Sequence, residues 1–329
     1  MLLTSTAPLA DSYDLAMLDL DGVVYIGKAV VPGAPDHIRG ARDAGLRIAF
    51  ITNNAARSPQ AVADHLAALG VEAAPADVVT SAQAAARLLA EDLGPGGRVV
   101  CLGGPGLEAA LAEAGLVPVG VEDEADALAS GYGPELRWSE IMQAAVRIRD
   151  GLAWTASNTD YTIPTAYGVA PGHGVLVETL QRFTRITPRV AGKPARPLLE
   201  ETIRRVGGKR PLMVGDRLDT DIEGARNAGV DSLLVLTGVT GLQELVDAPP
   251  ELRPSYVAPD LAGLLEVQRA PELTPGGAEL GGWRARVDDG RLVVEGDGEV
   301  GEWWRVVASA AWAHRDATGA VPDVSGLGR

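Results

Sequence analysis

LAMLDLDGVVYIG, residues 15–27, joins a run of apolar side chains to a pair of acids. Leu15 to Leu18 are apolar, as expected for a short buried strand, and Asp19, Asp21 and Gly22 follow directly. Two carboxylates one residue apart repel each other, so their position at the end of a strand needs a chemical explanation. The ends of the other predicted strands supply that explanation.

Short apolar runs alternate with helix-like segments along most of the chain, which predicts an α/β fold with a parallel sheet. In the first part, strands are expected at residues 13–18 and 46–52, with helices at 34–44 and 58–70. The second helix has a clear start signal, because Ser58 can cap its N-terminus.

A second α/β series begins near residue 80, and the chain returns to the first domain near residue 186. This predicts a Rossmann-like core of residues 1–79 and 187–268, interrupted by an inserted α/β domain at 80–186. Residues 269–329 form a small α+β extension: a linker, APELTPGG, then a hairpin with an Asp-Gly turn and a helix rich in tryptophan. So small a unit should pack on the rest of the chain or on a partner chain.

Composition narrows the class of protein. A formal net charge of −15 argues against nucleic acid as a partner, because nucleic-acid binding needs a basic face. No apolar run reaches the length of a membrane span, and the first residues lack the features of a signal peptide. The single cysteine, Cys101, allows no internal disulfide. Together these features predict a cytoplasmic protein with no membrane partner.

Two further acids follow a strand in the second half of the chain. Asp216 comes directly after the apolar run PLMVG, and Asp221 lies five residues later in GDRLDTD. In an open parallel sheet the carboxyl ends of the strands line one crevice, so these acids are expected close to Asp19 and Asp21. Clustered carboxylates need a cation among them, and their hard oxygens are typical ligands of Mg²⁺.

Two other segments carry groups that can bind phosphate. Thr52, Asn53 and Asn54 end the second strand, where a hydroxyl and backbone amides can bind phosphoryl oxygens. Lys193, in VAGKP, precedes a helix and can neutralise a phosphoryl group. Each pattern alone is common in turns and helix caps. All four in this order, each at the end of a predicted strand, indicate a phosphoryl-transfer site.

The segments DLDGVVYIG, ITNNAARSP, AGKP and VGDRLDTDI resemble the four motifs of the haloacid dehalogenase (HAD) superfamily, and more narrowly its class IIA phosphatases. The resemblance covers residues 14–265. The spacing of the motifs agrees with this class. The interval between Asp19 and Thr52 is too short for an inserted domain, whereas Lys193 lies 141 residues after Thr52, which is enough for one. The resemblance implies a HAD core with an inserted class II cap and the activity of a phosphatase.

The resemblance also implies a mechanism. Asp19 would attack phosphorus and form an aspartyl-phosphate, while Asp21 would act first as a general acid and then as a general base. Apolar surroundings are expected to keep Asp21 protonated before it donates. Mg²⁺ would be held by Asp19, the backbone carbonyl of Asp21, and Asp216, whereas Asp221 would bind a metal-bound water or orient Lys193.

Substrate contacts follow from the same resemblance. The segment at residues 157–174 is similar to the substrate-specificity loop of class IIA caps, and its contact candidates are Asn158, Asp160 and Tyr161. The groups implied in binding the phosphoryl oxygens are Thr52, Asn53, Asn54 and Lys193.

The identity of the substrate depends on the C-terminal extension. This extension is similar to that of the actinobacterial glycerol-3-phosphate phosphatases, which implies glycerol 3-phosphate as the substrate. Phosphoglycolate, or a broad specificity of the 4-nitrophenyl phosphate type, is the alternative within the family. A homodimer formed through the cap is also possible in this class.

Two readings from other classes stay open. A non-hydrolytic phosphoacceptor of the receiver type also uses clustered acids and Mg²⁺, but it is shorter and carries its acceptor in mid-chain. A catalytically inactive binding protein should lack at least one of the motif acids, and this sequence keeps all of them.

Overall fold

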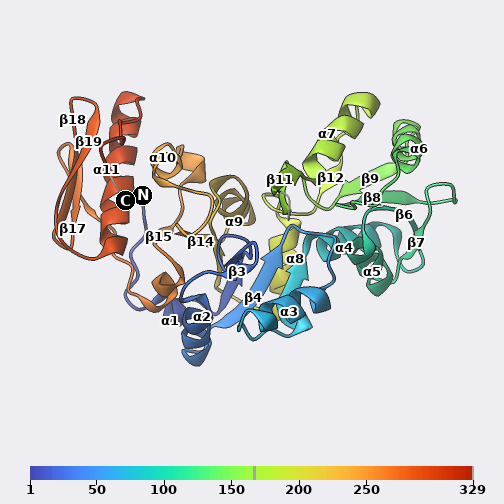
Figure 1. Cartoon of the computed structure of the whole chain (residues 1–329), viewed down its shortest axis with the longest axis horizontal. Coiled ribbons are helices and arrows are strands. Elements are labelled where there is room, and N and C mark those ends of the chain that lie inside the picture. Colours follow the sequence, from blue (N-terminus) through green and yellow to red (C-terminus); the bar gives the residue numbers. More distant parts are fainter. Residues whose placement is uncertain (166–167, 328–329) are drawn as a thin grey trace. The chain divides into compact units, whose positions relative to one another are not determined.

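The computed structural model describes residues 1–165 and 168–327. The chain forms two compact units, of which the first comprises residues 1–48 with 208–329 and the second residues 49–207 (Figure 1). The predicted α/β architecture with parallel sheets is confirmed. The exact boundaries expected for core, cap and extension stay a prediction.

Within the first unit, four strands lie side by side in the order β15–β14–β13–β1, and all are parallel. They are β1 (Leu15–Leu18), β13 (Pro211–Gly215), β14 (Asp231–Val235) and β15 (Tyr256–Ala258). Every residue of β1 has an exposed fraction of 0%. This is why the strand reads as an unbroken apolar run, as parallel strands covered on both faces do.

Short elements connect these strands. They are α1 (Leu9–Ser12), β2 (Tyr25–Ile26), β3 (Ala29–Val30), α2 (Ala34–Asp43), a π-helical turn η2 (Leu218–Ile222), α9 (Glu223–Ala228), α10 (Leu242–Val246), η3 (Pro250–Leu252) and η4 (Leu261–Leu265). Helix α2 ends where expected, just before Gly45 with its positive φ of 94°. The β2–β3 hairpin was not predicted, because each of its strands has only two residues.

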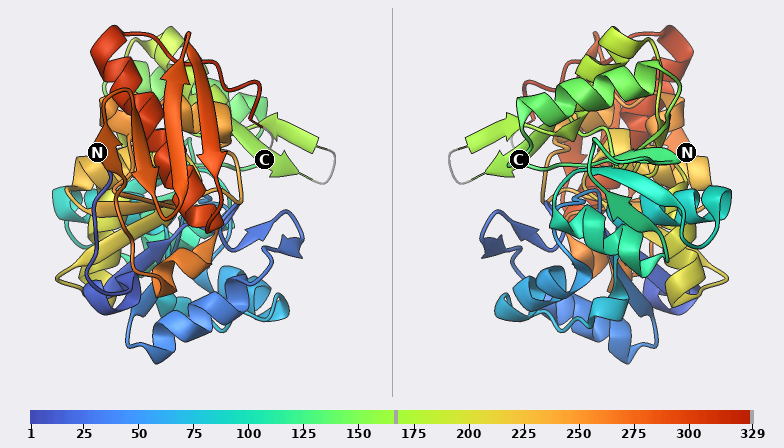
Figure 2. Two further views of the ribbon diagram at one scale, coloured as in Figure 1. Left: turned by 90° about the vertical axis from the view of Figure 1, so that its left-hand side faces the viewer. Right: turned by 90° about the vertical axis from the view of Figure 1, so that its right-hand side faces the viewer.

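The extension is a four-stranded antiparallel sheet packed on one long helix (Figure 2, left). Its elements are β16 (Glu272–Thr274), β17 (Gly277–Leu280), β18 (Trp283–Asp288), β19 (Arg291–Gly296) and α11 (Val300–Thr318). The hairpin and the helix confirm the prediction. The prediction of a linker at residues 270–277 is wrong, because this segment contains β16 and the turn into β17.

Two apolar clusters show that the extension packs on the first unit, as predicted. Trp303, Val306 and Val307 of α11 lie in one cluster with residues of β17, β18 and β19 and with Val246 of α10. Ala308 and Trp312 lie in a second cluster with residues of β14, β15, η2 and α10. The extension therefore shares a core with β14, β15 and the turn η2, which carries Asp221.

The second unit has a parallel sheet in the order β12–β9–β8–β6–β7, and its strands β4 and β5 also pair in parallel. The strands are β4 (Arg47–Thr52), β5 (Val78–Thr80), β6 (Arg98–Leu102), β7 (Val117–Val119), β8 (Ala127–Ser130), β9 (Ala153–Ala156) and β12 (Arg189–Val190), with an antiparallel hairpin β10 (Thr162–Thr165) and β11 (Gly168–Pro171).

Its helices include one, at residues 173–184, that the sequence did not predict. They are α3 (Pro59–Ala68), η1 (Pro75–Asp77), α4 (Ser81–Leu93), α5 (Pro105–Glu113), α6 (Trp138–Arg149), α7 (His173–Thr184) and α8 (Pro197–Val206). Ser58 caps α3 as predicted, since its Oγ accepts a hydrogen bond from the backbone N–H of Ala61 at 3.3 Å. Across both described parts of the chain, none of the helices has the length and hydropathy to cross a membrane.

A buried polar cluster lies in the interior of the second unit. Trp154 Nε1 donates to Ser130 Oγ at 2.8 Å, and the same hydroxyl lies 3.2 Å from His173 Nε2. His173 begins α7 and has an exposed fraction of 3%. Burial disfavours the charged ring and lowers the pKa of His173 to about 4.

Candidate active site

The pairing of β1 with β13 brings the acids of the first unit together. Leu18 lies opposite Val214 in the parallel ladder, and the backbone N–H of Asp19 continues the ladder by donating to the carbonyl of Val214 at 2.9 Å. Asp216 follows one residue after the end of β13. Both carboxylates therefore leave the sheet at its carboxyl edge, as the sequence predicts.

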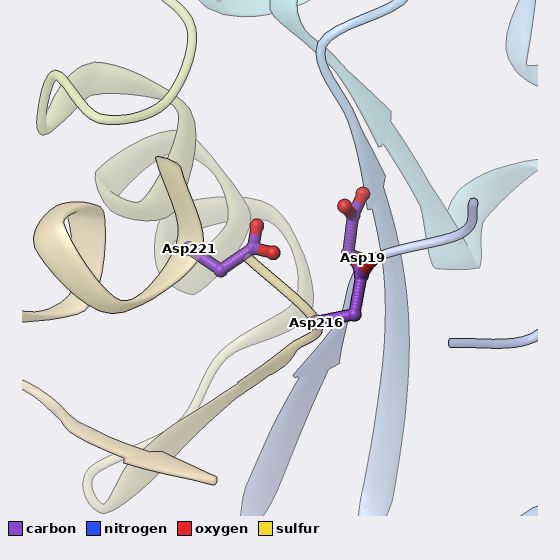
Figure 3. A group of neighbouring side chains, drawn as sticks. All are labelled: Asp19, Asp216 and Asp221. Carbon is purple, nitrogen blue, oxygen red and sulfur yellow. The ribbon is translucent and has the colours of Figure 1, made fainter. Parts of the chain in front are cut away.

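Three carboxylates meet at this edge (Figure 3). One oxygen from each of Asp19, Asp216 and Asp221 lies within 4.8 Å of the others. Asp216 and Asp221 are buried, with exposed fractions of 1% and 0%, and Asp19 is half-buried. Burying two carboxylates together is costly unless a cation offsets their charge, and three hard oxygen donors fit Mg²⁺.

Glycines make room for these carboxylates. A Cβ at Gly238 would lie 2.0 Å from Asp216 Oδ2, and a Cβ at Gly22 would lie 2.3 Å from the same atom. A Cβ at Gly215 would lie 2.2 Å from the Cβ of Asp221. At distances this short a side chain at any of the three positions would force the neighbouring carboxylate to move. The three glycines therefore keep the space in which the carboxylates lie.

The segment between β14 and α10 fixes Asp216. The backbone N–H of Val239 donates to Asp216 Oδ2 at 2.7 Å, and that of Thr240 donates to the Asp216 carbonyl at 3.0 Å. Thr237 Oγ1 donates to the carbonyl of Gly22 at 2.5 Å. Sequence reasoning missed this segment, because no single residue in it has the chemistry of a catalytic group.

Asp221 is fixed by its own turn. Its Oδ2 accepts a hydrogen bond from the backbone N–H of Arg217 at 3.1 Å, and the neighbouring side chains Leu218 and Ile222 are buried. The sequence assigns Asp221 to an outer position around the metal. In the structure its carboxylate belongs to the same group of oxygens as those of Asp19 and Asp216.

Asp21 lies in the tight turn that follows β1. The backbone N–H of Gly22 donates to the carbonyl of Tyr25 at 2.8 Å, and Gly22 has a φ of +82°, which glycine adopts without strain. The side chain of Asp21 is exposed. The apolar surroundings expected around Asp21 are therefore not found. The turn begins where the buried strand β1 ends, and at Asp21 it lies at the surface.

In the second unit, Asn53 connects three of the segments singled out in the sequence. Its Nδ2 donates to the Lys193 carbonyl and to Asp160 Oδ1, both at 2.9 Å, and its Oδ1 accepts from the Lys193 backbone N–H at 2.8 Å. Its own carbonyl accepts from Asn158 Nδ2 at 2.7 Å and from Ser81 Oγ at 2.6 Å. Both side-chain amide atoms of Asn53 are thus bonded to protein.

The neighbours of Asn53 form local turns. Thr52 Oγ1 accepts from the backbone N–H of Asn54 at 3.0 Å, and Asn54 Oδ1 accepts from the backbone N–H of Ala56 at 2.9 Å. These two bonds shape the chain that leaves β4, so that backbone amides follow one another in a curved segment. Lys193 has an exposed fraction of 2%.

The candidates of the predicted substrate loop divide into two kinds. Asn158 is buried, and its Oδ1 accepts from the backbone N–H of Asp160 at 3.1 Å. Asp160 is half-buried and bonded to Asn53, whereas Tyr161 is 55% exposed. Of the three, only the Tyr161 side chain projects into solvent. Residues 166 and 167 of the predicted loop lie outside the described residues.

Two protein-family models match the chain. A model described as haloacid dehalogenase-like hydrolase matches residues 16–117, and one described as HAD-hydrolase-like matches residues 190–264. Between them they contain the acids of the first unit and also Thr52, Asn53 and Lys193. The second model ends before the extension.

Characterised relatives carry the comparison further. The chain is 42% identical over 319 residues to D-glycerol 3-phosphate phosphatase of Mycobacterium tuberculosis, and the alignment covers 94% of this chain and 88% of the relative. It is 32% identical over 251 residues to acid sugar phosphatase of Staphylococcus aureus, which covers 76% of this chain and 95% of that protein.

Solved structures agree with these sequence matches. The crystal structure of glycerol phosphate phosphatase from M. tuberculosis in complex with magnesium superposes with a TM-score of 0.85 at 42% identity, covering 94% of this chain and 93% of that chain. A 4-nitrophenylphosphatase from Thermotoga maritima superposes with a TM-score of 0.72 at 29% identity, covering 78% of this chain and 98% of that chain.

Proposed function

Because the chain belongs to the haloacid dehalogenase-like hydrolases, we propose that it is a Mg²⁺-dependent phosphomonoesterase acting on a small phosphate ester. The observation that carries this proposal is the cluster of Asp19, Asp216 and Asp221 at the carboxyl edge of β1 and β13. Asp19 and Asp216 would hold Mg²⁺ together with the backbone carbonyl of Asp21, and Asp221 would bind there directly or through water. Bound Mg²⁺ supplies positive charge against the phosphoryl oxygens.

Asp19 is the nucleophile in this proposal. One of its carboxylate oxygens forms a bond to phosphorus while the bond from phosphorus to the ester oxygen breaks, which leaves an aspartyl-phosphate. Asp21 gives its proton to the departing ester oxygen, so an alcohol is released. Asp21 then takes a proton from water, whose oxygen attacks phosphorus and returns Asp19 and free phosphate.

The phosphate-binding groups of the proposal come from the other motifs of the family. We assign the phosphoryl oxygens to the Lys193 ammonium, the Thr52 hydroxyl and the backbone amides of Asn53 and Asn54. Contact through the Asn53 backbone is favoured, because its side chain is already bonded to Lys193 and Asp160. The Asn53 side chain is then a positioning group that holds the Lys193 backbone beside β4.

Glycerol 3-phosphate is the substrate we propose. The relative that acts on D-glycerol 3-phosphate aligns with 94% of this chain, and therefore with most of the extension. The 4-nitrophenylphosphatase covers a smaller share, 78%.

A substrate panel tests the proposal. Glycerol 3-phosphate, phosphoglycolate and 4-nitrophenyl phosphate are supplied with Mg²⁺ to the wild type, to Asp19→Asn and to Asp36→Asn, a control on the exposed surface of α2. We expect the highest kcat/KM for glycerol 3-phosphate. Asp19→Asn should lower kcat by more than about 10³-fold, because the variant lacks the nucleophile. Removing one hydrogen-bond donor to a transition state already lowers kcat by about 10²- to 10³-fold.

Four results would contradict this proposal, and they remove different parts of it. Turnover of none of the esters by the wild type, or full activity in Asp19→Asn, removes the phosphatase assignment. Equal kcat/KM for all three esters removes only glycerol 3-phosphate and leaves a broad phosphatase. Persistence of a phosphorylated chain without release of phosphate indicates a phosphoacceptor instead.

Two finer proposals accompany the activity. We propose a cytoplasmic location, supported by the single cysteine, Cys101, which can form no internal disulfide and suits a reducing compartment. We also propose a homodimer formed through the cap, for which Trp138, Met142 and Val146 offer an exposed apolar stripe at a spacing of four residues along α6. The mass of the protein in solution tests the second.

A further inference from the structure

Helix α10 lies between the acidic cluster and the C-terminal extension. The segment that leads into this five-residue helix bonds to Asp216 and to Gly22 through Thr237, Val239 and Thr240. The helix itself is covered by the extension, since Leu245 and Val246 are 0% exposed. Helix α10 is thus connected to Asp216 through the segment that precedes it, and α11 packs on the helix itself.

A tryptophan of the extension is bonded directly to α10. Trp312 Nε1 donates to the carbonyl of Leu245 at 2.8 Å, and the Trp312 side chain has an exposed fraction of 2%. The Leu245 carbonyl lies in the last turn of α10, where carbonyls have no partner inside the helix. The same carbonyl accepts the backbone N–H of Ala248 at 3.3 Å, so Trp312 provides its second and shorter hydrogen bond and connects the end of α10 to α11.

An ion pair and a cation–π contact support Trp312. The Arg253 guanidinium donates to both carboxylate oxygens of Asp316 at 2.7 Å, and its Cζ lies 5.3 Å from the centre of the Trp312 ring. Arg315 also donates to the carbonyl of Asp247, the residue that follows α10. These contacts fix α11 against the segment on the C-terminal side of α10.

The turn that carries Asp221 contacts the same part of α11. Leu218 and Ile222, which flank Asp221 in η2, share an apolar cluster with Ala308 and Trp312. Both buried acids of the site are thus connected to α11, Asp216 through hydrogen bonds and Asp221 through packing.

We propose that the C-terminal extension is a structural part of the metal site, with Trp312 as the positioning residue that sets Asp216 through α10. This rests on the proposed function, because the acids are taken to bind Mg²⁺. A truncated or shifted α11 releases α10, the segment at residues 237–241 relaxes, and the Asp216 carboxylate loses its fixed direction. Affinity for Mg²⁺ then falls, because ordering the ligand is added to the cost of binding.

Two matched variants separate this role from general stability. Trp312→Phe keeps a ring but removes the N–H that reaches α10. Trp283→Phe makes the same chemical change in the extension, where Trp283 Nε1 donates to the Glu299 carbonyl at 3.1 Å and both residues belong to the extension. The measurement is the dissociation constant of Mg²⁺ alone, by isothermal titration calorimetry on the full chain.

We expect Trp312→Phe to raise the Mg²⁺ dissociation constant by about 2- to 10-fold, the range set by one net hydrogen bond. Trp283→Phe should leave it at the wild-type value. A second variant, Asp316→Asn, weakens the ion pair with Arg253 and leaves no cavity. Its control is Asp323→Asn, because Asp323 forms an ion pair at 3.4 Å with Arg291, which also belongs to the extension. Asp316→Asn should change the constant in the same direction as Trp312→Phe.

The outcomes are distinct. Unchanged Mg²⁺ binding in both Trp312→Phe and Asp316→Asn overturns the positioning role of the extension. An equal loss of Mg²⁺ affinity in Trp312→Phe and Trp283→Phe also overturns the positioning role. Such a result shows that any weakening of the extension lowers the affinity. No Mg²⁺ binding by the wild type, in contrast, is a failure of the proposed metal site itself.

Discussion

The direction of the Asp216 carboxylate depends on residues that have no reactive group. The Val239 amide donates to it, and Gly238 leaves the space in which it lies. A buried carboxylate that accepts a backbone N–H is held in one orientation, which lowers the cost of binding a cation. Such residues determine how well the acids work together.

Gly238→Ala tests this dependence. The new Cβ would overlap Asp216 Oδ2, so the carboxylate has to move. We expect phosphatase activity to fall by about 10²-fold or more, in line with the loss on misplacing a reacting group by about 1 Å. Melting temperature and initial rate are the measurements. Gly326→Ala, where a Cβ meets nothing within 4 Å, is the control; equal activity in both variants would show that Asp216 needs no exact position.

Acid should weaken the second unit through His173. Its pKa of about 4 in the folded chain lies below the value of about 6.5 in an unfolded one, so the unfolded chain binds more protons between these values. Stability is therefore lost as pH falls from about 6.5 to about 4, by an amount on the order of 3 kcal/mol.

His173→Gln removes this titration and keeps a group that can bond to Ser130. We expect the variant to lose less free energy of unfolding than the wild type between pH 7 and pH 4.5, measured by urea denaturation. His314→Gln, in α11, should keep the wild-type pH dependence. A parallel decline of all three proteins would mean that His173 does not contribute.

Which residues could be predicted from sequence depends on where their signal lies. Asp19 and Asp216 each follow an apolar strand directly, so sheet geometry alone brings them to one edge. Gly238 and Val239 approach Asp216 only because the segment after β14 returns to this edge. Their signal is a contact across more than twenty residues, which a local pattern does not contain. The same holds for the Asn53 side chain, whose partners Asp160 and Lys193 lie more than 100 residues away.

At the scale of elements, the turn between β18 and β19 is a prediction that the structure confirms. Asp289 and Gly290 both have positive φ, 47° and 75°, as a two-residue turn of this hand requires. Gly290→Ala should lower the free energy of unfolding by about 1–2 kcal/mol, because a Cβ is unfavourable in this conformation. Asp289→Gly, the control in the same turn, should not destabilise. Thermal unfolding gives both values; equal effects would contradict this account.

Other elements were missed for a physical reason. The strands β16, β10 and β11 have three or four residues, pair in hairpins and contain or adjoin proline and glycine. In such short strands cross-strand pairing decides the structure, and propensity contributes little. Thus the segment expected as a linker at residues 270–277 has the composition of a linker and the pairing of a hairpin. Helix α3, in contrast, was predictable because its cap and its periodicity are local, whereas α7 begins after Gly172 without a side-chain cap and was missed.

At the scale of the whole molecule, the extension completes the core of the first unit. Leu234, Leu245, Val246 and Val257 are 0% exposed and lie in clusters that include residues of α11. Deleting residues 269–329 uncovers them. We expect the truncated chain to melt well below the full chain and to aggregate, since truncating a single buried tryptophan such as Trp312 already costs about 3–5 kcal/mol.

The comparison for this prediction is Trp312→Ala, which should melt between the full and the truncated chain. Differential scanning calorimetry and the soluble yield are the measurements. A truncated chain that stays soluble and melts at the temperature of the full chain would show that the first unit folds without the extension.

Four of the six tryptophans, at positions 283, 303, 304 and 312, lie in the extension, and the other two lie in the second unit. Trp303 and Trp304 stack edge to face at 4.8 Å, and Trp312 lies beneath the Arg253 guanidinium. Ultraviolet emission of this chain is consequently dominated by one small region. A fluorescence trace recorded during unfolding therefore reports chiefly on the detachment of α11, and it needs no added dye.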